Sequence, residues 1–304
     1  MKFNSLIANI LPYMPPRLVW IFSSRYIAGK TIEDGIRVSR ELNKAGAEVT
    51  IDLLGEFIKS MEEADTNKQK YLEIIERFVA EKINGNFSLK PSMFGLLIDK
   101  EICYNHLRDI IGKAQEKNSF VRIDMEDSQC VDMEIELYKR LKREFPRTVG
   151  LVFQAYMRRT LSDLQALMEV HSADAPLNFR LCKGIYIEPV EIAYKGYEEV
   201  RKNYLTILEN MFIHKIYVGI ATHDKYLVEE AYKLIEKYQV PRDKYEFQML
   251  YGVTPELRSS IINNGHRMRV YVPFGKDWFG YSTRRLKENP SVATLIIKAL
   301  FVRG

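Results

Sequence analysis

The chain has few cysteines and histidines, and their scatter excludes several classes of protein. Its three cysteines, Cys103, Cys130 and Cys182, lie far apart and form no CxxC pair, which is too little for a disulfide framework. A reducing compartment is therefore the simpler expectation. The five histidines are dispersed, without an HExxH motif or a Cys/His spacing typical of zinc ligands. We therefore expect no metal site.

Glycine-rich phosphate loops and blocks of basic residues are also missing. No GxGxxG or GxxxxGK[ST] motif opens an expected helix, which argues against dinucleotide-binding and P-loop folds. Lysine and arginine outnumber aspartate and glutamate by only 45 to 40, a net charge of +5. Without a basic block or an RNA-binding signature, we expect no nucleic-acid partner. A mildly basic surface would, however, be attracted to anionic lipid.

The N-terminal stretch 6–22 is apolar, but Pro12, Pro15 and Pro16 interrupt it. It lacks the apolar centre and small-residue cleavage site of a signal peptide, and it is too short to cross a bilayer. Two interpretations remain: a helical arm that packs on the domain, or a segment that lies on a membrane surface. We favour packing, because most amphipathic stretches face a core.

The remaining sequence alternates strand-like and helical segments. The chain has 304 residues, 46% hydrophobic and 28% charged, which is typical of a well-cored globular protein. Strict alternation of strand and helix predicts a parallel sheet, and eight such units in ~250 residues favour a closed barrel over an open sheet. The expected strands are Glu48–Leu54, Phe87–Lys90, Phe120–Asp124, Val149–Gln154, Asn178–Lys183, Ile216–Ala221, Tyr245–Leu250 and Met268–Val272.

Helical stretches follow these strands, for example Lys68–Glu81, Asp132–Glu144 and Lys225–Tyr238. No long linker or low-complexity segment divides the chain. We therefore predict one α/β domain, a modified (β/α)8 TIM barrel. The expected division is an N-terminal helical arm over residues 1–45 and a catalytic barrel over residues 46–304, which includes a C-terminal helix at 291–303.

Polar residues recur where the expected strands end. Active sites of such barrels lie at the C-terminal ends of the strands, and buried charges are costly unless they are paired or used. Each residue alone could be a satisfied core group, but so many at one face are hard to explain by packing. They are Glu56, Lys90, Asp124, Glu126, Asp127, Gln154, Arg180, Lys183, Thr222, His223, Asp224, Gln248 and Tyr271.

The segment 269–288 suggests a site for a small carboxylate. Its first part, residues 269–275, reads as a buried strand that presents Tyr271 and ends at a proline and a glycine. Its second part reads as a helix with Arg284, Arg285 and, one turn on, Glu288. Guanidinium groups match a carboxylate with two parallel hydrogen bonds. The alternative is a solvated helix with ordinary Arg–Glu pairs at i, i+3 and i, i+4.

Nine short segments, taken in order, resemble the proline dehydrogenase family, flavoenzymes that oxidise L-proline. Each is modest alone, but the ordered set spans nearly the whole barrel and is specific. The resemblance implies a (β/α)8 barrel with non-covalent FAD, similar to the monofunctional bacterial enzymes, because no aldehyde dehydrogenase domain follows. The segments are 52–56, 88–90, 122–127, 154–156, 180–186, 221–224, 246–252, 269–273 and 284–288.

The resemblance also implies roles for individual residues. Those assigned to proline are Arg284, Arg285 and Lys90 for its carboxylate, Tyr271 and Tyr186 for its ring, Asp124 to order the lysine, Glu288 to brace the arginines and Glu56 to pair with Arg284 over the bound substrate. Those assigned to the flavin are Gln154, Arg180, Cys182, Lys183, Gly184, Thr222 and His223. Asp124 and Glu56 would offset the cations, because desolvated cations need partners.

The reaction that the resemblance implies is hydride transfer from C5 of proline to flavin N5, which gives Δ1-pyrroline-5-carboxylate. The usual acceptor of the family is a membrane quinone. We therefore expect a cytoplasmic protein that associates peripherally with the inner face of the cell membrane, with a Δ1-pyrroline-5-carboxylate dehydrogenase as a further partner.

Three positions depart from the pattern of the family. Cys182 stands where valine is common, and it places a thiol near the flavin that oxidation could reach. Ile185 replaces a smaller alanine. After Glu288 the common Asn-Thr-Ser-Phe pattern is missing, which leaves the contacts of the C-terminal helix open.

Three other functions compete with proline oxidation. The first is an aldolase in which Lys90 or Lys183 forms a Schiff base, which requires a lysine with a depressed pKa. The second is a hydroxyproline dehydrogenase, against which Tyr271 argues because its ring fills the space that a hydroxyl group would need. The third is a binding barrel without catalysis, which the density of polar groups at one face disfavours.

Overall fold

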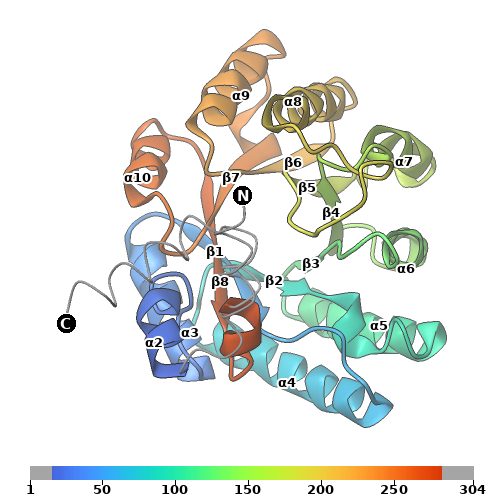
Figure 1. The fold of residues 1–304 in the computed structure, drawn as a ribbon, viewed down its shortest axis with the longest axis vertical. Coiled ribbons are helices and arrows are strands. Elements are labelled where there is room, and N and C mark those ends of the chain that lie inside the picture. The colour runs from blue at the N-terminus through green and yellow to red at the C-terminus, as the bar shows by residue number, and fades with distance from the viewer. Residues whose placement is uncertain (1–15, 283–304) are drawn as a thin grey trace.

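Eight parallel strands form a closed barrel and follow one another in sequence order. The computed structural model describes residues 16–282, and Figure 1 shows a ring of helices around the barrel. The predicted (β/α)8 class is confirmed. The strands are β1 (Glu48–Leu53), β2 (Gly85–Leu89), β3 (Val121–Ile123), β4 (Val149–Gln154), β5 (Asn178–Cys182), β6 (Tyr217–Ala221), β7 (Tyr245–Leu250) and β8 (Met268–Phe274).

Helices connect successive strands and cover the outside of the barrel (Figure 1). Two helices, α2 (Pro16–Ser23) and α3 (Ile32–Lys44), precede the barrel. The others are α4 (Met61–Ala80), α5 (Lys100–Glu116), α6 (Val131–Glu144), α7 (Thr160–Leu167), α8 (Tyr197–Ile213), α9 (Lys225–Lys237) and α10 (Pro255–Asn263), with short 3₁₀ turns η2 (Pro91–Phe94), η3 (Met168–Val170) and η4 (Arg242–Lys244).

Two element boundaries differ clearly from prediction. Helix α4 begins at Met61 and not at Lys68, because Ser60 caps it by accepting a hydrogen bond from the backbone of Glu63. Strand β8 continues through Pro273 to Phe274, two residues beyond the expected end. The carbonyl groups of Pro273 and Phe274 accept hydrogen bonds from Ala28 and Leu54. These partners extend the strand although proline offers no N–H group.

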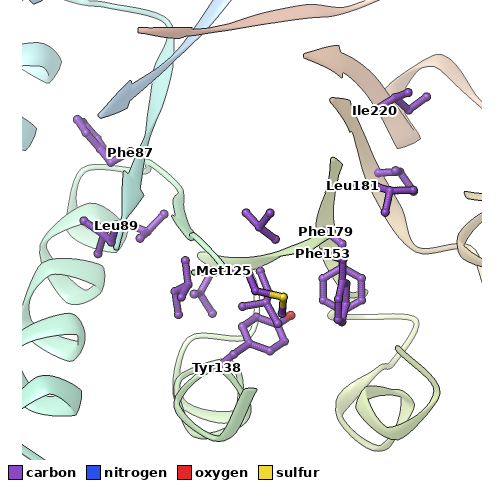
Figure 2. Close-up of a cluster of buried hydrophobic side chains, with 14 of the residues drawn as sticks. Phe87, Leu89, Met125, Tyr138, Phe153, Phe179, Leu181 and Ile220 are labelled. Carbon is purple, nitrogen blue, oxygen red and sulfur yellow. The ribbon is translucent and has the colours of Figure 1, made fainter. Parts of the chain in front are cut away.

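Outward-facing side chains of the strands are apolar and pack against the helices. Successive residues of a strand point to opposite faces, and alternate positions here are large and buried. Figure 2 shows Tyr138 of α6 beside Phe153 of β4 and Phe179 of β5. The Phe153 and Phe179 rings meet edge to face at 4.9 Å, and Tyr138 lies 5.9 Å from Phe179. This layer is the hydrophobic core of the protein.

Inward-facing positions of the same strands are largely polar or charged, whereas branched aliphatic residues usually fill such barrels. Two glycines make room for the long polar side chains. A Cβ atom at Gly150 would lie 2.5 Å from Arg122 Nη1, and one at Gly219 would lie 2.3 Å from Gln248 Nε2. The interior of the barrel is therefore built around polar groups, and the site described below is its upper part.

The N-terminal helices pack on the barrel, as we favoured over a membrane-surface segment. The Trp20 ring of α2 meets Trp278 edge to face at 4.7 Å, and the Lys30 ammonium group lies 5.2 and 5.4 Å from these two rings. Residues 1–15 and the expected helix at 291–303 lie outside the described residues, so the proposed division of the chain stays a prediction. None of the helices within 16–282 combines the length and the apolar character needed to cross a membrane.

Candidate active site

Lys90 follows the end of β2, and its buried ammonium group faces polar groups of three other segments. Its Nζ atom lies 2.6 Å from Asp52 Oδ1, 3.3 Å from the Tyr271 hydroxyl oxygen and 3.6 Å from Asp124 Oδ2. These partners come from β1, β8 and the residue directly after β3. Residues far apart in the sequence thus converge at the C-terminal end of the barrel, where such enzymes place their chemistry.

Asp124 is the acceptor that joins this group together. Its Oδ1 atom accepts hydrogen bonds from Arg180 Nη2 at 2.5 Å and from the Ser88 hydroxyl group, and its Oδ2 atom accepts one from the Tyr271 hydroxyl at 2.9 Å. The Arg180 guanidinium also lies 5.0 Å from the centre of the Tyr271 ring, within range of a cation–π contact. The structure therefore brings together Lys90, Asp124, Arg180 and Tyr271, all four predicted as site residues.

The charges of this group are mutually stabilised. Burial raises the pKa of Asp124, but Arg180 and Lys90 outweigh burial and hold it below its ordinary value. Burial lowers the pKa of Lys90, yet Asp52, Tyr271 and Asp124 raise it well above the usual range. Lys90 is therefore a cation at neutral pH. A Schiff-base lysine needs the opposite shift, so this arrangement argues against Lys90 as an aldolase nucleophile.

A second polar cluster lies at the ends of β5 and β6. Lys183 Nζ lies 2.6 Å from Asp224 Oδ2, which also accepts hydrogen bonds from the Tyr197 hydroxyl at 2.8 Å and from Arg201 Nε at 2.9 Å. Burial raises the pKa of Asp224, but its bonds to Arg201 and Lys183 more than reverse this and lower it. Asp224 is therefore a fixed carboxylate that holds Lys183 in place.

His223 and Thr222 complete this second cluster. The backbone N–H of Leu250 donates to His223 Nε2 at 2.8 Å, so Nε2 carries no proton and a neutral ring keeps its proton on Nδ1. Burial, and then the Lys183 charge, lower the pKa of His223 to about 4, which keeps the ring neutral at neutral pH. The buried Thr222 hydroxyl accepts from the backbone of Asp224 at 3.1 Å and retains its own proton for donation.

Cys182, Gly184 and Gln154 lie between the two clusters in the sequence or beside them on β4. Gly184 has φ +105°, and a Cβ atom there would lie 2.1 Å from the Tyr156 ring, so this position requires glycine. Cys182 is half-buried, with Sγ 3.5 Å from the Phe153 carbonyl oxygen. Gln154 is buried and donates to the Glu126 carbonyl oxygen at 2.8 Å.

Tyr186 and Glu56 belong to a third group, at the rim of the site. Burial raises the pKa of Tyr186 well above its usual value, and Glu126 and Glu56 add to this shift. Glu126 in turn accepts from the Ser92 hydroxyl at 2.5 Å and from the Ser92 backbone at 2.8 Å. Glu126 and Glu134, with Cys130, place potential metal ligands within 4.8 Å of one another. Hydrogen bonds to Ser92 and to the Glu126 backbone account for the two carboxylates, so we assign no metal there.

Three predicted site residues, Arg284, Arg285 and Glu288, lie outside the described residues, and so does the predicted Glu56–Arg284 pair. Within the described part, the roles of the remaining residues toward substrate and cofactor stay predictions. The structure shows how these side chains are held, and the chemistry belongs to the proposal below.

Several residues of the site were missed from the sequence. We expected Asp124 and Glu56 to offset the charge of Lys90, whereas the carboxylate oxygen nearest to its ammonium group among the described residues is that of Asp52. Asp52 interrupts the apolar run Val49–Leu54, and an acid inside a buried strand signals a specific partner. For Ser88, Ser92 and Arg201 no local pattern marks the role, because each is an ordinary polar residue until its partner is known.

Comparisons with known proteins bear on this site. Residues 36–296 match the family model for proline dehydrogenase. The chain is 33% identical over 276 residues to proline dehydrogenase 1 of Bacillus subtilis (strain 168), a match that covers 91% of this chain and 89% of the relative. It is 32% identical over 286 residues to proline dehydrogenase of Deinococcus radiodurans, covering 93% and 91%.

Among solved structures, the chain resembles proline utilization A (PutA) from Bdellovibrio bacteriovorus inactivated by N-propargylglycine. The TM-score is 0.88 at 24% identity, and the match covers 95% of this chain but 37% of the PutA chain. At this identity the likeness supports the barrel fold alone. The assignment of a family rests on the sequence matches.

Proposed function

Because the chain belongs to the proline dehydrogenase family and is an oxidoreductase that acts on proline, we propose that it oxidises L-proline to Δ1-pyrroline-5-carboxylate with a non-covalently bound FAD. The observation that carries this proposal is the convergence of Lys90, Asp124, Arg180 and Tyr271 at the C-terminal end of the barrel. Cations held by a buried carboxylate beside an aromatic ring suit a small cyclic amino acid.

Lys90 is proposed to bind the carboxylate of proline, together with Arg284 and Arg285. Its ammonium group is already positioned by Asp52 and Tyr271, so little side-chain freedom is lost when a ligand binds. A positive field around the substrate also favours the neutral form of the ring amine over its cation. The amine nitrogen lone pair is then available to assist loss of hydride from C5.

Tyr271 and Tyr186 are proposed to enclose the ring, and Glu56 and Glu288 to brace the arginines. The Tyr271 hydroxyl donates to Asp124 at 2.9 Å, which fixes its ring relative to Lys90. Asp124 thereby positions Lys90, Arg180 and Tyr271 at once. Geometric control of this kind is a main source of catalytic rate in enzymes that rely on orientation.

The residues at the ends of β4, β5 and β6 fit a flavin dinucleotide by the chemistry of their donors. Lys183 offers a cation for phosphate, Thr222 and the Nδ1–H of His223 offer neutral donors, and Gln154 and Arg180 offer donors deeper in the barrel. The backbone at Cys182 and Gly184 would contact the flavin as well. A bound flavin would supply the hydride acceptor, and the protein supplies binding and electrostatics.

Electrons are proposed to pass on to a membrane quinone, with Δ1-pyrroline-5-carboxylate dehydrogenase as the consumer of the product. This requires the protein, taken as cytoplasmic, to associate peripherally with the inner face of the membrane. The mild basic excess of the chain, +5, supports attraction to anionic lipid. Co-sedimentation with vesicles that contain anionic lipid tests this part, and an absence of binding at low salt contradicts it.

The test of the enzymatic proposal is the visible spectrum of the purified protein, recorded before and after anaerobic addition of L-proline. We expect a flavin band that bleaches with proline. A flavin band that stays oxidised would contradict proline as the reductant while keeping the cofactor. Absence of a flavin band, with failure of FAD reconstitution, would overturn the assignment of the cofactor.

A further inference from the structure

The backbone at Phe57, in the loop between β1 and α4, adopts a conformation that bulky residues rarely take. Six residues other than glycine within 16–282 have positive φ. Four of them directly follow the C-cap residue of a helix, where a left-handed residue ends the helix in the ordinary way. These four are Lys82, Asn118, Lys215 and Gln239.

A fifth residue, Thr254, is the N-cap of α10. Phe57, with φ +51°, lies between Leu54 and Ser60, away from any helix end. Left-handed backbone in a residue of this size persists only where its surroundings impose it, and such positions cluster at functional sites.

The group that imposes this conformation is the Ser92 side chain. The backbone N–H of Phe57 donates to Ser92 Oγ at 2.9 Å, and Ser92 Oγ donates to Glu126 Oε1 at 2.5 Å. Glu126 Oε2 also accepts from the Ser92 backbone at 2.8 Å. Ser92 and Glu126 are both buried. A buried serine whose hydroxyl both accepts and donates has its orientation fixed, so it can hold the loop at a defined position.

This chain of hydrogen bonds continues into the barrel wall. The Glu134 carboxylate of α6 accepts from the Glu126 backbone N–H at 3.0 Å, and Gln154 of β4 donates to the Glu126 carbonyl oxygen. Glu126 is therefore held from two sides before it holds Ser92. The loop at Phe57 hangs at the free end of this rigid series.

Each anchor of the series is two residues from a residue of the active site. Ser92 follows Lys90, and Glu126 follows Asp124. The loop itself begins just after Asp52, the partner of Lys90. Packing adds a second contact between the two loops, because a Cβ atom at Gly55 would lie 2.8 Å from the Met93 terminal methyl group.

We propose that Ser92 and Glu126 are positioning residues that hold the β1–α4 loop, with Glu56 and Phe57, in a strained closed position beside Lys90. The inference rests on the proposed function, in which Lys90 binds the substrate carboxylate. It deepens that function by naming what sets the shape of the substrate site on the β1 side. Without the Ser92 bond, Phe57 relaxes to ordinary backbone angles and the loop moves away from the site.

The test measures amide hydrogen exchange of residues 54–60 in the FAD-loaded enzyme, together with the steady-state oxidation of proline. In Ser92→Ala we expect faster exchange in 54–60 and a KM raised about tenfold, equivalent to about 1.4 kcal/mol, with kcat within about twofold. The matched control is Ser39→Ala. Ser39 is equally buried, in α3, and its hydroxyl has no hydrogen-bond partner within the described chain. It should change neither quantity.

Strain is tested by placing asparagine, which tolerates positive φ better, at position 57. In the Phe57→Asn background, Ser92→Ala should accelerate exchange less than it does in the wild type, because the loop no longer gains by leaving the left-handed region. An equal or larger acceleration would overturn the role of strain. Unchanged exchange in Ser92→Ala, or faster exchange with unchanged KM, would overturn the positioning role.

Two further outcomes keep the test decisive. Should Ser92→Ala fail to fold, Phe57→Asn alone should exchange no faster than wild type, because the Ser92 bond remains. Faster exchange would show that packing of the Phe57 ring holds the loop instead, and would overturn the proposal. Exchange is measured whether or not proline is oxidised, so an inactive enzyme would contradict the proposed function and leave the test of the loop intact.

Discussion

The barrel interior contains two charged layers that use the same kinds of residue in different ways. In the lower layer, Arg269 donates to Glu246 at 2.7 Å and to the Val49 carbonyl oxygen at 2.9 Å. Arg122 donates to the backbone and the side chain of Asn178 at 2.8 and 2.7 Å. In the upper layer, Lys90, Asp124, Arg180 and Tyr271 bond mainly to one another.

The difference is the type of acceptor. Backbone carbonyl groups are fixed by the strands, so the lower layer ties its guanidinium groups to the wall of the barrel. Bonds between side chains can rearrange around a ligand, which the upper layer must do if it binds substrate. In such barrels the lower face serves stability and the upper face serves chemistry. Here the same distinction divides the charged groups of one interior.

The largest expected effect is on the lower layer. Arg269→Met leaves Glu246 buried without its principal cation, and removing one partner of a buried pair costs about 3–5 kcal/mol. We expect a loss of that size in the free energy of unfolding, measured by urea denaturation, with KM for proline of the folded enzyme unchanged. Arg267→Met is the control, since Arg267 is partly exposed and surface pairs contribute about 0–1 kcal/mol. Equal losses in the two variants would refute the comparison.

The two layers should respond oppositely to pH. Burial raises the pKa of Glu246, but Arg269 reverses this and brings it to about 2, so its stabilisation is present above its unfolded pKa and is lost as pH falls from 4.5 toward 2. Burial raises the pKa of Asp52 to about 6, so its folded form binds a proton more tightly than the unfolded form does. Stability then falls as pH rises from about 4 to about 6.

Each shift corresponds to roughly 3 kcal/mol over its window, at about 1.4 kcal/mol for each pKa unit. Glu246→Gln should therefore flatten the stability profile below pH 4.5, and Asp52→Asn should flatten it between pH 4 and 6. Denaturation at a series of pH values measures both profiles. If the two variants lose the same window, the two layers do not differ electrostatically.

A smaller effect is expected at Lys90, and on activity rather than stability. Lys90→Met removes one charged hydrogen bond to the substrate carboxylate, worth about 1.5–3 kcal/mol, so kcat/KM for proline should fall by about 10- to 100-fold. Steady-state kinetics measures this, with Lys113→Met, a lysine paired with Glu76 outside the barrel, as the control. An unchanged kcat/KM would remove Lys90 from the substrate site.

The smallest effect concerns the choice of substrate. Tyr271→Ser removes the ring that is proposed to crowd a hydroxylated substrate, and we expect the preference for proline over hydroxyproline to fall by about tenfold, or about 1.4 kcal/mol. The ratio of kcat/KM for the two substrates measures it. Tyr217→Ser at the start of β6 is the control and should leave the ratio unchanged. An unaltered ratio in Tyr271→Ser would refute the steric argument.

Much of the fold could be predicted because its signals are local. Apolar and polar residues alternate along β1, β5 and β8, and this period assigns one face to the helices and the other to the interior. Polar residues at strand ends, such as Lys90 and Tyr271, could therefore be placed at the C-terminal face of the barrel from the sequence alone. The start of α4 was missed, although Ser60 and Glu63 have the spacing of a helix cap.

The sequence by itself determined the barrel, the direction of its strands and the face on which the site lies, because strand period and strand–helix alternation depend on neighbours in the chain. Only the tertiary structure decided the pairs: Asp52 with Lys90, Asp224 with Lys183, and Ser92 with the backbone of Phe57. Each pair joins segments more than 30 residues apart. Such pairing depends on the stagger of the strands around the closed barrel, which no local pattern specifies.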